Sequence, residues 1–98
     1  RKELSEEGVI VVSVAIDFAK RKLLNNPDVI SRGFVNINES MELFNACKGI
    51  IKEAVLEALE KDNTGVYHMR QSIVEALGEF LENEIGRKPV ILPTILEV

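Results

Sequence analysis

The stretch GVIVVSVAIDF, at residues 8–18, decides the fold, because it is the most continuously apolar of the segments that could form strands. Its many β-branched residues favour an extended backbone, and we expect a strand over about Val9–Asp17. A strand that is apolar on both sides is typical of the middle of a sheet. We therefore place this strand at the centre.

Two further strands are expected around it. The segment LLNNPDVISRGFVNI, at residues 23–37, predicts a second strand, which Asn25, Asn26 and Pro27 interrupt because proline has no N–H and asparagine favours turns. A polar turn precedes it, so the first two strands form an antiparallel hairpin. The final PVILPTILEV predicts a third strand, in which Pro93 points to an edge position or a bulge.

Two helices are predicted between the second and third strands. Asn38 or Ser40 can cap the first helix, whose apolar residues recur at spacings of three and four. Its expected apolar stripe is Leu43, Cys47, Ile50, Ile51, Ala54, Ala58 and Leu59. The second helix runs from about residue 67 to 85 with Gly86 as its C-terminal cap. Its expected stripe is Met69, Ile73, Leu77, Phe80 and Leu81.

The fold class that follows is α+β, with the order β-β-α-α-β. We expect a three-stranded mixed sheet of strand order 2-1-3, with two antiparallel helices packed on one face. Residues 8–98 should form this single domain, and residues 1–7, RKELSEE, should be the tail of a linker from a longer protein without a signal peptide. No apolar run approaches the roughly 18 residues that a membrane span needs, so no membrane partner is expected.

Catalytic chemistry finds little support in the residue types. A zinc site commonly takes three protein ligands, and the chain has one His and one Cys. We expect Cys47 to be a buried, inert thiol and His68 to be an exposed or locally bonded side chain. The sequence therefore indicates no catalytic residue, no metal ligand and no cofactor within these residues.

Both faces of the first and third strands are largely apolar, whereas two helices can cover only one face of the sheet. The other face should be an apolar patch of the kind that marks an interface. Our candidates for this docking surface are Val11, Arg32, Phe34 and Ile95. In the alternative, Gly33 forms a bulge, Phe34 turns into the core and Arg32 only holds a loop.

Basic residues form two small groups in a chain whose net charge is −4. Such a charge argues against a mainly electrostatic nucleic-acid binder, but a local contact remains open. The candidate contacts to RNA phosphates are Lys20, Arg21, Lys22, Arg87 and Lys88. Their alternative roles are solubility and complementing the dipoles at helix ends.

Three stretches resemble one known family: GVIVVSVAID, PDVISRGFVNINES at residues 27–40 and GRKPVILPTILEV at residues 86–98. They are similar to the C-terminal domain of ribonuclease J, of the metallo-β-lactamase/β-CASP ribonucleases. The resemblance implies a cytoplasmic, zinc-dependent parent enzyme with 5′-to-3′ exonuclease and endonuclease activity, acting in RNA decay and rRNA maturation. It also implies that the metal ligands lie upstream, in the β-lactamase and β-CASP parts.

What the resemblance implies for these residues is an accessory domain, itself not catalytic, that supports oligomer assembly and activity. Its partners would be the rest of the parent nuclease and further copies in a homo-oligomer, with RNA bound by the parent. Two alternatives stay open: an RNA-contacting module that guides substrate to the nuclease, and an unrelated small protein-interaction domain.

Overall fold

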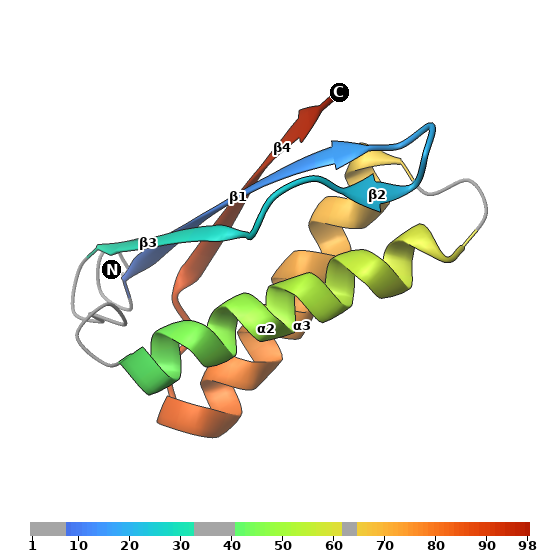
Figure 1. The fold of residues 1–98 in the computed structure, drawn as a ribbon. Helices are drawn as coiled ribbons and strands as arrows, with labels where there is room; N and C mark the ends of the chain where they lie inside the picture. The colour runs from blue at the N-terminus through green and yellow to red at the C-terminus, as the bar shows by residue number, and fades with distance from the viewer. Residues whose placement is uncertain (1–7, 33–40, 62–64) are drawn as a thin grey trace.

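The computed structural model of the chain describes residues 8–32, 41–61 and 65–98. The order of elements is β1 (Val9–Asp17), β2 (Lys22–Leu23), β3 (Asp28–Arg32), α2 (Met41–Leu59), α3 (Val66–Ile85) and β4 (Val90–Glu97). The strands form one sheet, and both helices lie side by side against the same face of it (Figure 1). The predicted α+β class is confirmed, and the hydrophobic core lies between the two layers.

Strand β1 is the centre of the sheet, as its sequence predicts. Its residues alternate between fully buried side chains, which face the helices, and half-buried ones, which face away. β2 and β3 pair with one edge of β1 in antiparallel register, and β4 pairs with the other edge in parallel register. The expected strand order 2-1-3 is therefore correct, with the second strand divided into two short pieces.

The division between β2 and β3 has a local cause at residues 24–27. The backbone N–H of Leu24 donates to the carbonyl of Ala15 at 2.8 Å. The N–H of Ala15 donates in turn to Oδ1 of Asn25 at 2.9 Å, so a side chain replaces the backbone acceptor of a regular ladder. The buried Pro27, which has no N–H, follows. The strand therefore bulges here and resumes at Asp28, as the Asn-Asn-Pro sequence predicts.

Pro93 lies in β4 at a position where its missing N–H costs nothing in the ladder. Val90 donates its N–H to the carbonyl of Gly8, and Val98 donates to the carbonyl of Ile16. Alternate residues of a strand point their N–H groups the same way, so position 93 points away from β1, toward the free edge. The edge position predicted for Pro93 is confirmed.

The stripe of helix α2 is rotated slightly from the sequence expectation. Its buried residues are Cys47, Ile51, Ala54, Val55, Ala58 and Leu59. Val55 is fully buried although the predicted stripe omits it, and Ile50 is only half-buried. Val55 lies four residues after Ile51, so it occupies the same side of the helix. The sheet-facing side therefore centres on Ile51 and Val55.

Helix α3 follows its prediction closely. Met69, Ile73, Leu77 and Leu81 are fully buried, while Phe80 is half-buried at the side of the core. Gly86 ends the helix in the left-handed conformation, with φ of 67°, and its N–H donates to the carbonyl of Glu82 at 2.9 Å. The expected cap of α2, Asn38 or Ser40, lies outside the described residues.

Candidate functional site: an open sheet face

The face of the sheet that points away from the helices carries several exposed apolar side chains, and we call it the open face. Val11 lies at its centre and pairs with Ile30 of β3 on one side and with Leu92 of β4 on the other. Directly paired side chains point to the same face, so these three form an apolar row across the sheet. Ile30 is 51% exposed, Leu92 48% and Leu96 63%.

Polar groups interrupt the apolar surface at defined places. Ser13 pairs with Asp28 of β3 and with Thr94 of β4, which makes a polar row next to the Val11 row. Arg32 pairs with Val9 at the end of β3 and is exposed. The open face therefore carries one acidic and one basic side chain on the same strand, four residues apart, with Ile30 between them.

The predicted docking residues divide in this arrangement. Val11 and Arg32 lie on the open face, as expected. Ile95 does not: it pairs with the buried Val14 and packs against the hydrophobic core on the helix-covered face. The placement of Ile95 on the open face is therefore wrong, and the exposed β4 leucines on that face are Leu92 and Leu96. Phe34 lies outside the described residues, so its place on this face stays a prediction.

The two basic groups lie at opposite ends of the sheet. Lys20, Arg21 and Lys22 follow the C-terminal end of β1, whereas Arg87 and Lys88 precede β4, whose first residue pairs with the first residue of β1. A strand rises about 3.3 Å per residue, so roughly 25 Å separates the groups. Nζ of Lys88 also lies 3.4 Å from Oε2 of Glu82. The groups do not form one continuous phosphate-binding surface.

Arg21 has a structural partner. Its guanidinium donates a hydrogen bond to the carbonyl of Lys61, just beyond the C-terminal end of α2. A cation at this end of a helix complements the helix dipole. Its backbone has φ of 54°, which is rare for a residue with a side chain. The turn before it is closed by the N–H of Lys20, which donates to Oδ1 of Asp17 at 3.0 Å. Arg21 thus ties the hairpin turn to the helix layer.

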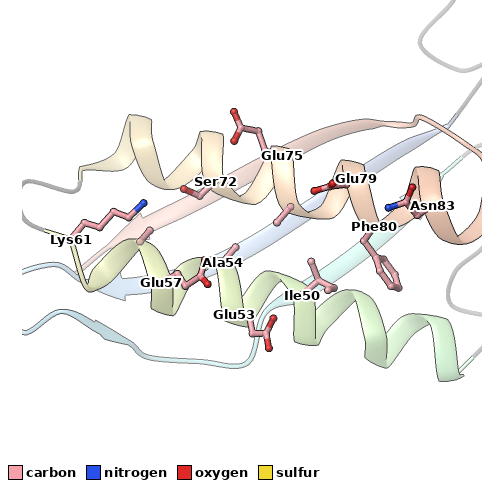
Figure 2. Close-up of a pocket in the computed structure, with 12 residues that line it drawn as sticks. Ile50, Glu53, Ala54, Glu57, Lys61, Ser72, Glu75, Glu79, Phe80 and Asn83 are labelled. Carbon is pink, nitrogen blue, oxygen red and sulfur yellow. The ribbon is translucent and has the colours of Figure 1, made fainter.

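A groove between α2 and α3 on the outer side of the helix layer is acidic. Figure 2 shows Glu53 and Glu57 of α2 and Glu75 and Glu79 of α3 along it, with Ile50 and Phe80 at one end. Lys61 is the one cation among its lining residues. Glutamates at this density repel phosphate groups, so this side of the domain is unsuited to RNA.

The residues that sequence analysis considered for catalysis are not assembled into a site. Burial raises the pKa of the Cys47 thiol to about 11, which keeps it protonated and unreactive at neutral pH. His68 is exposed and contacts Tyr67 edge-on, with ring centroids 5.6 Å apart. Within residues 8–32, 41–61 and 65–98, no three His, Cys, Asp or Glu side chains lie close enough to hold a metal ion. The described residues do not fit the zinc centre that the resemblance implies for the parent.

None of the described helices is long and apolar enough to cross a membrane.

Comparison with known proteins identifies the family. The family model described as the ribonuclease J C-terminal domain matches residues 1–98. Ribonuclease J2 of Bacillus subtilis is 36% identical over 98 residues, which are 100% of this chain and 18% of that protein. Ribonuclease J 1 of Streptococcus pyogenes is 33% identical over 96 residues, 98% of this chain and 17% of that protein. The chain thus spans less than a fifth of the length of these curated relatives, and it belongs to the ribonuclease J C-terminal domain family.

Proposed function

We propose that this chain is a non-catalytic accessory domain of a ribonuclease, and that it supports assembly of the enzyme by docking through its open face. The parent would be a zinc-dependent exo- and endoribonuclease of the cytoplasm that acts 5′-to-3′ in RNA decay and rRNA maturation. Its zinc ligands would lie in the β-lactamase and β-CASP parts. Membership of the ribonuclease J C-terminal domain family and the similarity to two ribonucleases J support the ribonuclease assignment.

The observation that carries the docking proposal is the exposure of the apolar row on the open face. Ile30, Leu92 and Leu96 are about half-exposed or more. They belong to strands of a sheet whose other face is covered by the two helices. Covering an apolar surface of this kind releases roughly 25 cal/mol per Å². A face of this composition favours burial against another protein surface over contact with water.

The edges of the sheet favour docking by the face rather than by strand addition. The outward-pointing position of Pro93 breaks the row of N–H donors along the free edge of β4. A proline at an edge strand is a common device against edge-to-edge pairing. A partner is therefore expected to bind the open face rather than the edge of β4.

A second copy of the chain fits the open face by charge. In a two-fold symmetric interface, a contact between residue i of one subunit and residue j of the other is always repeated between residue j of the first and residue i of the second. Asp28 and Arg32 lie on the same strand and the same face, with opposite charges. Two faces related by a two-fold axis can therefore pair Asp28 of each copy with Arg32 of the other, around the row that contains Ile30.

The test replaces Leu92 and Leu96 with serine in the full-length parent protein and measures its oligomeric state by sedimentation. Both side chains are exposed, so the melting temperature should change little. Loss of two apolar contacts from an interface core should weaken assembly by roughly tenfold or more. The matched control replaces Met41 and Leu56, which are similarly exposed but belong to helix α2 on the other side of the sheet. Unchanged assembly of the first variant, or equal weakening of both, contradicts the proposal.

A further inference from the structure

The acidic groove between α2 and α3 has a floor of small apolar side chains. Its volume is about 530 Å³. Ala54 and Ala58 of α2 are buried along it, and Ala76 of α3 is half-buried. The larger side chains of Ile50 and Phe80 lie at one end (Figure 2). Because an alanine side chain is a single methyl group, another segment can approach the two helices closely here.

Four glutamates line the two rims of the groove, and on each helix they are four residues apart. Glu53 and Glu57 belong to α2, Glu75 and Glu79 belong to α3, and all four are exposed (Figure 2). Within residues 8–32, 41–61 and 65–98, no cation forms an ion pair with any of them. Like charges at this spacing repel each other and destabilise a helix. A bound cation would therefore relieve a repulsion that the fold leaves in place.

Helix α2 holds its own cations on another side. Lys48 and Lys52 are four residues apart, and neither lines the groove. Nζ of Lys48 lies 5.0 Å from the ring centroid of Phe44 instead. Lys61, the one cation among the lining residues, lies beyond the last residue of α2. The carboxylates and the cations of α2 are thus separated, which gives the groove a local negative charge that attracts cationic partners.

The dimensions of the groove match a third helix. Its lining residues on α2 run from Ile50 to Lys61, which is about 17 Å, or roughly three turns, at the rise of a helix. A helix in a groove makes contact through one apolar stripe, with anchors at spacings of three and four residues. Lysine or arginine side chains beside that stripe would reach both rims, and their aliphatic stems would cover the floor. An extended segment alternates its side chains between two faces and does not offer this combination.

We propose that the acidic groove binds a basic amphipathic helix of a partner protein, with its apolar stripe on the alanine floor and its cations against the glutamates of both rims. Charge complementarity favours this occupant. A second copy does not supply such a helix, because α3 has one arginine and four glutamates and α2 has two lysines and three glutamates. The groove lies on the outer side of the helix layer, opposite to the open face (Figure 1). The proposal is therefore independent of assembly through the open face.

The test compares two fluorescein-labelled peptides that contain the same number of leucines and lysines. In the first peptide the leucines recur at spacings of three and four, which makes an amphipathic helix. In the second peptide leucine and lysine alternate, which favours an extended backbone of the same charge. Fluorescence anisotropy at low salt measures the binding of each peptide to the 98-residue chain. The helical peptide should bind more tightly by roughly tenfold or more, because only its leucines can cover the floor together.

Two charge variants locate the contact. E57Q/E79Q removes one carboxylate from each rim, whereas the control E60Q/E84Q removes the same charge from exposed positions that do not line the groove. An exposed ion pair changes a binding constant by up to about fivefold. E57Q/E79Q should therefore weaken binding of the helical peptide by about fivefold or more, and E60Q/E84Q by less than about twofold. Far-UV circular dichroism verifies that both variants fold.

Two neutral variants test the floor. A76Q places a longer, uncharged side chain on the floor of the groove, and A46Q makes the same change at another half-buried position, on α2 and outside the groove. Glutamine is a good helix former, so both variants should keep the fold. A76Q should weaken binding of the helical peptide by about fivefold or more through loss of close packing, whereas A46Q should leave it unchanged.

Any of four results would overturn the proposal. The helical peptide may fail to bind at low salt, or bind no better than the alternating peptide, which would mean diffuse attraction to a negatively charged chain. Equal weakening by E57Q/E79Q and E60Q/E84Q would have the same meaning. Unchanged binding by A76Q would show that the peptide does not reach the floor. Sedimentation in which E57Q/E79Q alters self-association of the chain would assign the groove to a second copy instead.

Discussion

The substitutions I51A and I50A form a matched test of the fold, because they make the same change at neighbouring positions of α2 with different surroundings. Ile51 is fully buried in the core, whereas Ile50 is half-buried beside the groove between the helices. Alanine removes three carbons, which is about 2.4 kcal/mol of transfer free energy at a buried site. The cavity left behind places the total for Ile51 within about 2–5 kcal/mol.

Ile50 should lose much less. Its side chain is partly in water already, and solvent can fill the space that it leaves in the open groove, so we expect a cost of about 1 kcal/mol. The gain in helix propensity from Ile to Ala is similar at both positions and cancels in the comparison. I51A should therefore be less stable than I50A by about 2 kcal/mol, or roughly 8 °C or more in melting temperature for a domain of this size.

Urea unfolding monitored by circular dichroism measures both free energies of unfolding, with the unsubstituted chain as reference. Equal costs for I50A and I51A would refute this account of α2. Such a result would mean that Ile50 also faces the sheet, as the sequence pattern alone suggests, and that the rotation of the helix toward Ile51 and Val55 is wrong.

Two further predictions concern glycine and the buried thiol. Gly49→Ala should stabilise the chain by about 0.5–1 kcal/mol, because an added Cβ there meets nothing within 4 Å. Gly86→Ala should destabilise it by about 1–2 kcal/mol, because φ is 67° at that position. Thermal unfolding in which both variants shift the melting temperature in the same direction would contradict this. For Cys47, the unfolded thiol ionises near pKa 9.0 and the folded one near pKa about 11, so stability is full below pH 9 and falls above it. The loss should approach about 3 kcal/mol relative to Cys47→Ala once the pH has risen past both pKa values, and parallel pH profiles of the two proteins would exclude it.

The sequence predicts local structure well wherever a single segment contains the whole signal. The alternation of β1, the break at Asn25–Pro27 and the cap at Gly86 are each set by residues close together in the chain, and each is confirmed. Residue types also indicate the strand order, because only β1 is apolar enough for the centre.

The parts that sequence reasoning missed depend on pairing between distant segments. Whether Ile95 or Leu96 faces the helices is decided by the register of β4 against β1, which no local pattern within β4 contains. The rotation that buries Val55 rather than Ile50 likewise follows from how α2 sits on the sheet.

The parallel pairing of β1 with β4 has a consequence for how the domain is made. Val9 pairs with Val90, so roughly 80 residues must follow the central strand before its second edge can be closed. At translation rates of about 5–20 residues per second, β1 waits for about 4–16 seconds with an apolar edge unpaired. Within the domain, the central strand β1 is thus synthesised first, and its second edge is the last to be paired. The nascent chain is therefore a candidate for chaperone binding during that interval.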